Sequence, residues 1–327
     1  MALRSIEEIR EIHDLPFPIL VHRAMTVHQR MWDPTRLQAC VLDSLRTGGC
    51  SEDCAYCAQS AHHATEVKPD PLKDEQAVLE GARRARALGA TRYCMATSGR
   101  VLEEGTDFDA VLHVIREVRA LGLEACVSLG LINATQARRL KEAGCTIYNH
   151  NLDSSRLVYE RIVSTHTFED RLATIRAVHE AGLGVCCGGI LGMGEREEDR
   201  IHFLHELAQI NPAPEAIPLN QLVPVPGTPL EGLEPIHPIA FLRVVATARI
   251  LFPSSSIRLA AGRSAMSDEM QALAFLCGAN SIFTGEKLLT TPGAVPGEDA
   301  VLMERLGLVF DVKSKVNGKA HPAPFLT

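Results

Sequence analysis

Thr91-Arg92-Tyr93-Cys94-Met95 is a β-prone run that is followed by a helical pattern from Phe108 to Ala120, by Gly122, and by a second β-prone run, Glu124-Ala125-Cys126-Val127-Ser128-Leu129. The apolar residues between the two runs recur at helical spacing. A glycine shortly after the last periodic residue is typical of a helix end. This stretch therefore predicts a strand, a helix and a second strand in succession.

The same alternation continues along the chain in both directions. Helical patterns separate further β-prone runs, and several of these patterns also end in glycine. Eight alternating strand and helix units predict an α/β fold, a TIM-type (βα)8 barrel. The eight predicted strands are Leu37–Leu42, Thr91–Met95, Glu124–Leu129, Thr146–Asn149, Gly184–Cys187, Ala216–Asn220, Ser256–Ala260 and Asn280–Phe283.

The two ends of the chain fall outside this alternation. We expect residues 1–35 to form an N-terminal helical extension packed outside the barrel, residues 36–311 to form the barrel, and residues 312–327 to form a C-terminal tail. A chain of 327 residues that is 46% hydrophobic is long enough for one large barrel or for two medium domains. The absence of a Pro/Ser-rich linker favours one domain.

The charge and hydropathy of the sequence argue against a nucleic-acid partner and against insertion into a membrane. The net charge of -7 is modest and dispersed, without a Lys/Arg-rich stripe, so nothing favours nucleic acid. No run of about 18 apolar residues predicts a membrane span, and the N-terminus lacks the apolar core of a signal peptide. We therefore expect a cytoplasmic protein that acts on small molecules.

Cys50, Cys54 and Cys57 form a C-x3-C-x2-C motif in a polar loop that begins with two glycines. An iron-sulfur cube normally takes four cysteines, so three of them leave one iron open. An open iron can hold a small molecule and pass it one electron, the arrangement that radical S-adenosylmethionine enzymes use with this spacing. The loop follows the first predicted strand, at the barrel end where active sites collect.

A structural zinc site is the alternative interpretation of the same cysteines. Such sites usually supply four Cys or His ligands from paired knuckles, whereas the spacing here is asymmetric. His62 and His63 follow closely, and one of them would complete a site of three cysteines and one histidine. This alternative stays open on motif grounds.

The second, third, fifth and seventh predicted strands contain Cys94, Cys126, Cys186 and Arg258, respectively. If the pleat points them inward, their side chains converge inside the barrel. A buried cysteine is usually only a small apolar side chain, and an arginine facing a core usually pairs with a carboxylate. The competing hypothesis is a second, smaller iron-sulfur cluster held by three thiolates and Arg258.

The sequence resembles the biotin synthase family over nearly its full length, from Trp32 to Leu308. The resemblance implies sulfur insertion into dethiobiotin to form biotin. The motifs that carry it are CSEDCAYCAQS (residues 50–60), GLEAC (122–126), YNHNLD (148–153), CGGILGMGE (187–195), GTPL (227–230), RLAAGR (258–263) and GANSIF (278–283).

The same resemblance implies the cofactors. Cys50, Cys54 and Cys57 would bind a 4Fe-4S cluster that chelates and cleaves S-adenosylmethionine. The products would include a 5'-deoxyadenosyl radical that takes hydrogen from the substrate. Cys94, Cys126, Cys186 and Arg258 would hold a 2Fe-2S cluster whose sulfide is the sulfur donor. The cysteines of the loop and Arg258 would be the catalytic residues.

The resemblance also implies binding residues and partners. Asn151 and Asp153 would bind the ribose of S-adenosylmethionine, Arg171 its carboxylate, and Asn149 and Asn220 the polar groups of dethiobiotin. Side-chain amides suit a ureido ring because they carry donors and acceptors. The expected partners are an electron-donor protein such as flavodoxin or ferredoxin, and a second copy of the chain in a homodimer.

Two points in this scheme remain open. Cys187 stands beside Cys186 where the family commonly has serine, so either thiol is available as the third ligand, and the strand register favours Cys186. A different radical S-adenosylmethionine enzyme of the same barrel type, such as a methyl mutase or a maturase, would share Cys50, Cys54 and Cys57 but typically lacks the strand cysteines with Arg258. A catalytically inactive relative is a third possibility, against which the full set of motifs argues.

Overall fold

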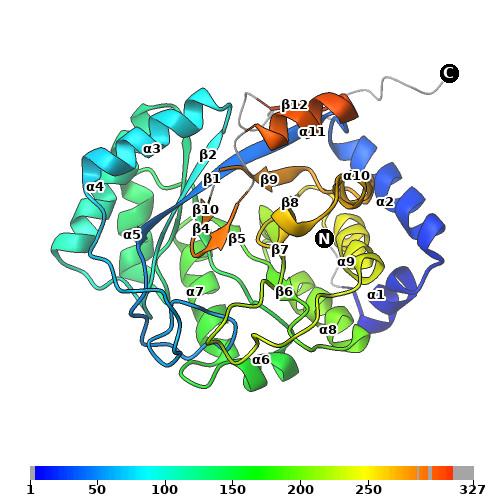
Figure 1. The fold of residues 1–327 in the computed structure, drawn as a ribbon, viewed down its shortest axis with the longest axis horizontal. Helices are drawn as coiled ribbons and strands as arrows, with labels where there is room; N and C mark the ends of the chain where they lie inside the picture. The colour runs from blue at the N-terminus through cyan, green and yellow to red at the C-terminus, as the bar shows by residue number, and fades with distance from the viewer. Residues whose placement is uncertain (1–3, 286, 294–296, 312–327) are drawn as a thin grey trace.

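The computed structural model describes residues 4–285, 287–293 and 297–311, and it contains the predicted barrel (Figure 1). Parallel strands pair in sequence, and the last of them pairs with the first, so the sheet closes. The fifth strand of the barrel is interrupted after Cys186 and resumes at Gly189. The barrel strands are β1 (Arg36–Arg46), β2 (Arg92–Thr97), β3 (Glu124–Ser128), β4 (Ile147–Asn149), β5 (Gly184–Cys186) with β6 (Gly189–Leu191), β7 (Ala216–Gln221), β8 (Ser256–Leu259) and β9 (Ser281–Phe283).

Helices cover the outer face of this barrel, as Figure 1 shows. Helices form between the strands, as the helical patterns predicted, and the glycines that follow α3, α4, α5 and α7 have positive φ, which is common at helix C-caps. These helices are α3 (Glu75–Ala87), α4 (Thr106–Ala120), α5 (Ala134–Glu142), α7 (Phe168–Glu180), α8 (Glu197–Ala208), α9 (Pro238–Leu251) and α10 (Asp268–Leu276).

The N-terminal helices α1 (Ile6–His13) and α2 (Phe17–Met31) pack outside the barrel against α8 and α9. Leu20 and Ala24 of α2 are fully buried, and Trp32 Nε1 donates to the Pro253 carbonyl at 2.8 Å. The predicted tail, residues 312–327, lies outside the described residues. Within the described part of the chain, no helix is long and apolar enough to cross a bilayer.

Several short elements have no counterpart in the sequence prediction. They are α6 (Arg156–Ile162), the hairpin of β10 (Lys287–Leu288) and β11 (Thr291–Pro292), α11 (Glu298–Leu306) and β12 (Val309–Phe310). β12 extends the sheet by pairing with the start of β1. Apart from α11, which is as long as α5 and α10, these elements are too short for periodicity to distinguish them from loops.

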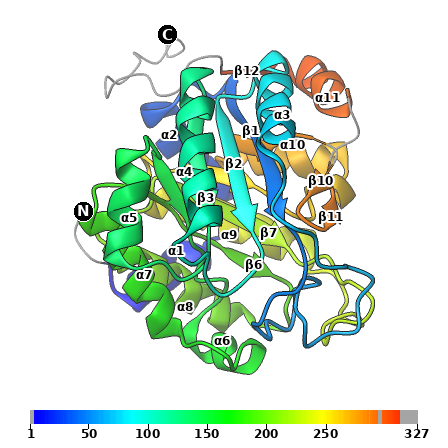
Figure 2. The ribbon, with the colours of Figure 1, turned by 90° about the vertical axis from the view of Figure 1, so that its left-hand side faces the viewer.

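Two long loops meet at the carboxyl end of the barrel. The loop after β1 and the loop of residues 222–237 lie side by side in Figures 1 and 2. They touch at Gly227, which has a φ of +83° and whose Cβ, if present, would overlap the Ala64 carbonyl. The loop that carries the motif cysteines is therefore in contact with a second loop at this end of the barrel.

Candidate active site

The cysteine loop has a fixed backbone. Cys50 N donates to the Gln59 carbonyl at 2.9 Å, and Cys57 N donates to the Cys54 carbonyl at 2.9 Å. Gly48 precedes the motif with a φ of +72°, and a Cβ there would lie 2.5 Å from Lys68 O, so no larger residue fits. Cys54 is buried, and Cys50 and Cys57 are partly exposed. Burial raises the pKa of the Cys54 thiol to about 12.

The two acids inside the motif anchor this loop. Asp53 accepts from the backbone N–H of Ser164 at 2.9 Å and of Thr165 at 3.2 Å. Glu52 accepts from the Thr165 hydroxyl at 2.6 Å and contacts the His166 ring. Burial raises the pKa of Asp53, but these hydrogen bonds outweigh it and lower the pKa well below its usual range. Sequence reasoning missed this role for the acids of CSEDC.

The structure gives the zinc interpretation no support. His62 Nε2 lies 3.0 Å from the Ser51 carbonyl, and His63 Nε2 lies 3.0 Å from the Cys54 carbonyl. Both rings thus face main-chain oxygens, whereas a zinc site needs four ligands around one point. Among the described residues, no three His, Cys, Asp or Glu side chains are close enough to hold a single metal ion.

Behind the cysteine loop, the predicted S-adenosylmethionine residues form one network. Asp153 is buried and accepts from Tyr56 OH at 2.6 Å and from Arg171 NH2 at 2.7 Å. Arg171 also donates to the Asn151 carbonyl at 2.9 Å and to Tyr159 OH at 2.7 Å. Tyr56 lies between Cys54 and Cys57, so its hydroxyl ties the motif to Asp153. The sequence analysis overlooked Tyr56, although its place inside the motif was the available signal.

Inside the barrel, the three strand cysteines come together. Cys94 and Cys126 lie opposite each other in the β2–β3 register, and Cys186 joins them from β5. All three are at most 4% exposed, and they belong to an apolar cluster separate from the main core. A hydrogen bond with Cys126, together with burial, raises the pKa of Cys94, and burial raises that of Cys186 to about 11. Cys187 packs instead in the main core.

Arg258 lies beside these three cysteines and has no carboxylate partner among the described residues. Its guanidinium donates to Ser281 Oγ at 2.9 Å, to Gln38 Oε1 at 3.3 Å and to Cys186 Sγ at 3.6 Å. No carboxylate of the described residues forms an ion pair with it, although the side chain is fully buried. A buried cation needs negative charge nearby. Thiolates and sulfides supply that charge, so this donor set fits an iron-sulfur cluster.

A cavity of about 110 Å³ lies against the three thiols and Arg258. Asn149, Asn151 and Asn220 also line it. The Oδ1 atom of Asn149 is buried and has no hydrogen-bond partner in the described structure, which is unusual for a polar atom unless a ligand completes it. The Asn220 amide is engaged by the backbone, donating to the Gly189 carbonyl at 2.9 Å and accepting from Ala261 N at 3.0 Å.

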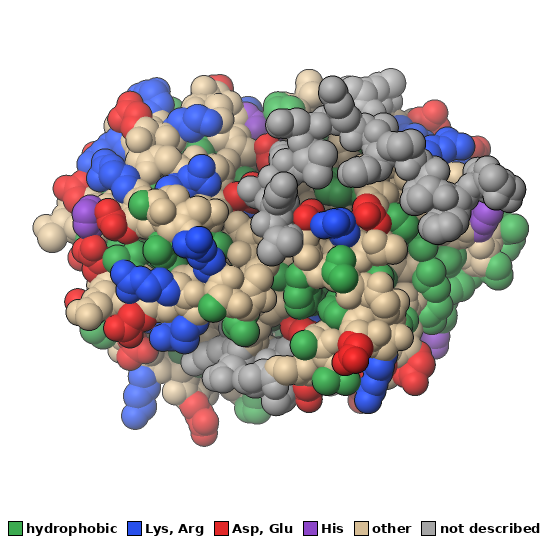
Figure 3. Space-filling view, turned by 90° about the horizontal axis from the view of Figure 1, so that it is seen from above, with side chains coloured by type: hydrophobic (Ala, Val, Ile, Leu, Met, Phe, Trp, Pro, Cys, Tyr) green, Lys and Arg blue, Asp and Glu red, His purple; other side chains and the backbone are tan. Residues whose placement is uncertain are grey.

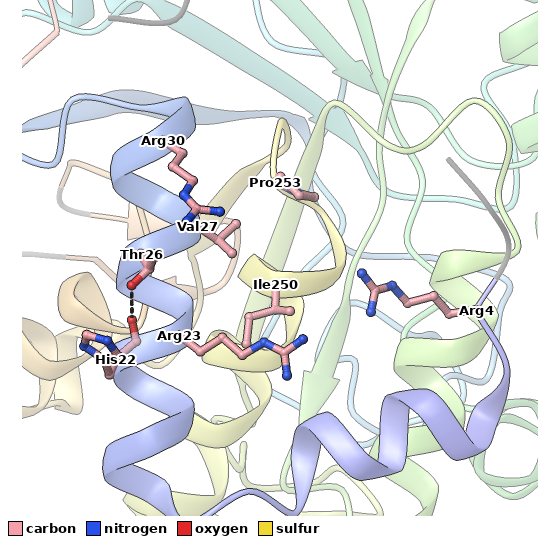
Figure 4. Close-up of a pocket in the computed structure, with 8 residues that line it drawn as sticks. All are labelled: Arg4, His22, Arg23, Thr26, Val27, Arg30, Ile250 and Pro253. Atoms are coloured by element: carbon pink, nitrogen blue, oxygen red, sulfur yellow. Dashed lines mark hydrogen bonds between the residues drawn. The ribbon is translucent and has the colours of Figure 1, made fainter. Parts of the chain in front are cut away.

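A larger hollow, of about 470 Å³, lies outside the barrel between α2 and α9 (Figure 4). Its lining includes Arg4, Arg23 and Arg30 around the apolar side chains of Val27 and Ile250. None of the predicted site residues borders it. The predicted site residues therefore lie at and within the barrel mouth and not in this outer hollow.

Two protein-family models match parts of the chain that contain the residues of this site. Residues 44–207, which include the cysteine loop, Cys94, Cys126 and Cys186, match the model of the radical SAM superfamily. Residues 218–309, which include Arg258 and Ser281, match the Biotin and Thiamin Synthesis associated domain. The two matches together cover the barrel strands β2 to β9, except for the first two residues of β7.

Relatives that match nearly the whole chain identify the family within this superfamily. The chain is 52% identical to the biotin synthase of Methylobacterium sp. (strain 4-46), over 93% of this chain and 92% of that protein. It is 50% identical to the biotin synthase of Sorangium cellulosum (strain So ce56), over 93% and 87% of the two chains. Methylornithine synthase has the same fold with a TM-score of 0.78 over 94% of both chains, at 18% identity. This chain belongs to the biotin synthase family of the radical SAM superfamily.

Proposed function

We propose that this chain converts dethiobiotin into biotin by radical sulfur insertion. Cys50, Cys54 and Cys57 would hold a 4Fe-4S cluster at the barrel mouth, and Cys94, Cys126, Cys186 and Arg258 would hold a 2Fe-2S cluster inside. When bound, the first cluster supplies the electron that cleaves S-adenosylmethionine, and the second supplies the sulfur. The observation that carries the proposal is that three strand thiols and Arg258, an arginine without a carboxylate partner among the described residues, line one cavity inside the barrel.

Within this scheme the chain's own residues shield and orient the reactants. A closed barrel interior keeps water from reactive species, which would otherwise attack nearby groups. Asn149 would accept a hydrogen bond from a ureido N–H through its unpaired Oδ1. Asn220 is already held by the backbone, so it would contact dethiobiotin only through its second amide N–H or its remaining lone pair.

The residues near the cysteine loop would bind S-adenosylmethionine. Asp153 and Asn151 would contact its ribose, and Arg171 its carboxylate. The support for this assignment is proximity: Tyr56 joins the motif to Asp153, and Arg171 joins Asp153 to Asn151. Asp153 would keep its position through Tyr56 and Arg171 while it accepts from a ribose hydroxyl.

Other radical SAM enzymes provide the alternative function. Methylornithine synthase and the FeFe-hydrogenase maturase HydG from Carboxydothermus hydrogenoformans share the fold, the latter with a TM-score of 0.78, 17% identity and coverage of 95% of this chain and 76% of that chain. At this identity the likeness concerns the fold alone. The buried group of Cys94, Cys126, Cys186 and Arg258 favours sulfur insertion, because single-cluster chemistry leaves those thiols without a role.

The proposal includes an electron-donor protein, a homodimer and a cytoplasmic location. One-electron chemistry requires a reductant, and a flavodoxin or ferredoxin would serve. A homodimer is supported by exposed apolar side chains on two adjacent helices, Leu273 and Leu276 on α10 and Val301 and Leu306 on α11. Figure 3 shows green side chains on the right-hand half of the view, the half in which α2, α10 and α11 lie in Figure 1. All ten cysteines are free, which suits a reducing cytoplasm.

The direct test is an anaerobic assay of the reconstituted chain with dethiobiotin, S-adenosylmethionine and a reductant. Mass spectrometry should detect biotin and 5'-deoxyadenosine together. Formation of 5'-deoxyadenosine without biotin, in enzyme that carries both clusters, would contradict sulfur insertion and favour the alternative radical chemistry.

A further inference from the structure

A fourth thiol, Cys40 of β1, lies inside the barrel close to the group of Cys94, Cys126, Cys186 and Arg258. Its side chain is fully buried. Unlike Cys145, Cys187 and Cys277, which pack in the main core, Cys40 belongs to neither apolar cluster of the described structure. A buried cysteine usually packs as a small apolar side chain, and the surroundings of Cys40 are polar instead.

Ser281 connects Cys40 to Arg258. Cys40 Sγ lies 3.8 Å from Ser281 Oγ, and the same oxygen accepts from Arg258 Nε at 2.9 Å. Gln38, two residues before Cys40 on β1, accepts from Arg258 NH2 at 3.3 Å. Ser281 lies opposite Arg258 in the β8–β9 register. The sulfur of Cys40 is therefore one hydroxyl group away from the arginine assigned as a cluster ligand.

A second buried arginine provides independent support. Arg92 lies opposite Cys40 in the β1–β2 register and is 2% exposed. Its Nη2 atom pairs with Glu124 at 2.9 Å, but its Nη1 atom is buried without a hydrogen-bond partner among the described residues. An unsatisfied guanidinium nitrogen is costly in a core. A thiolate or sulfide in this part of the barrel would offset that cost.

We propose that Cys40 is a reserve ligand of the inner cluster, able to replace Arg258 on the same iron. The inference rests on the proposed function, because it assumes a 2Fe-2S cluster in this cavity. Thiolate is the usual ligand of iron-sulfur clusters, whereas a guanidinium is not. Removing Arg258 would leave Ser281 Oγ, which now accepts from Arg258 Nε, beside Cys40 Sγ at 3.8 Å, and a turn of the Cys40 side chain would have to carry its sulfur past this hydroxyl.

The test compares four reconstituted proteins: Arg258→Ala, Cys40→Ser, the double variant Cys40→Ser/Arg258→Ala, and the matched control Cys277→Ser/Arg258→Ala. Cys277 is a buried thiol at the end of α10 and takes no part in the inner group. Iron content and the visible absorption of the 2Fe-2S cluster are measured, together with the rate at which a chelator removes it. Arg258→Ala, Cys40→Ser and the control should retain the cluster. The double variant should lose it at least tenfold faster.

Equal cluster loss in Arg258→Ala and in the Cys40→Ser/Arg258→Ala variant would overturn the proposal. Arg258→Leu, which fills more of the space, repeats the comparison if Arg258→Ala does not fold, and retention of the 4Fe-4S absorption reports that the barrel is intact. A wild-type protein without any 2Fe-2S signal would instead contradict the proposed function. The two failures are therefore distinguishable.

Discussion

Replacing Tyr56 by phenylalanine should weaken the binding of S-adenosylmethionine without removing a cluster ligand. The hydroxyl of Tyr56 donates to the buried carboxylate of Asp153 at 2.6 Å. A hydrogen bond to a charged group contributes about 1.5–3 kcal/mol, and 1.4 kcal/mol is a factor of ten in binding. Because Arg171 still holds Asp153 at 2.7 Å, we expect the lower end, about a tenfold increase in KM for S-adenosylmethionine.

The structure offers a matched control at Tyr93. Its hydroxyl donates to Asp43 at 2.7 Å, outside the barrel and beneath α3. Tyr93→Phe therefore removes the same kind of hydrogen bond, and both variants should lose a few degrees of thermal stability. The assay measures 5'-deoxyadenosine formation against S-adenosylmethionine concentration, with the iron content checked first. An unchanged KM in Tyr56→Phe, or an equal rise in Tyr93→Phe, would refute the reasoning.

Four other predictions follow from the geometry. Cys54→Ala should abolish cleavage of S-adenosylmethionine and keep the 2Fe-2S absorption; retained cleavage would contradict the motif assignment. Cys126→Ala should lose the 2Fe-2S absorption, whereas Cys187→Ser, which alters a thiol of the main core, should keep it. Asn149→Ala should raise the KM for dethiobiotin about tenfold, the value of one hydrogen bond of about 1.4 kcal/mol, and leave the KM for S-adenosylmethionine unchanged. The pKa of Asp53 is lowered in the folded chain, so the hydrogen bonds of its carboxylate to Ser164 and Thr165 should be complete above the ordinary aspartate pKa near 4 and weaken below it. Removal of the loop's iron by a chelator should therefore accelerate with acid in the wild type. An equal acceleration in Asp53→Asn would exclude this anchor.

The barrel was predictable because its evidence is periodic. Each unit repeats a β-prone run, an amphipathic helix and a terminal glycine, and the family relatives and the closed sheet confirm the resulting fold. Arg258 could be selected because a charged residue is unusual in a buried run. A single buried cysteine is not unusual, and Cys94, Cys126 and Cys186 could be selected because they lie on separate strands of the predicted barrel. Their convergence followed from the pleat once eight strands were assigned.

The contacts between distant segments could not be predicted in the same way. The anchor of Glu52 and Asp53 lies more than 100 residues away, at Ser164 and Thr165, and no local pattern encodes such a pairing. The place of Tyr56 inside the motif was a signal, but its partner, Asp153, follows a different strand, so the hydrogen bond between them could not be predicted from the local sequence. Cys40 lies in an apolar run of the sequence, as other cysteines do, and only the register of β1 with β2 and β9 distinguishes it.

The most direct test of the account is the iron inventory of the anaerobically reconstituted wild-type chain by Mössbauer spectroscopy, combined with chemical iron analysis. Three loop thiols and a separate buried group of three thiols with Arg258 predict two distinct clusters and about six iron atoms per chain. About four iron atoms in a single cluster type would contradict the central claim that the barrel interior holds its own iron-sulfur centre.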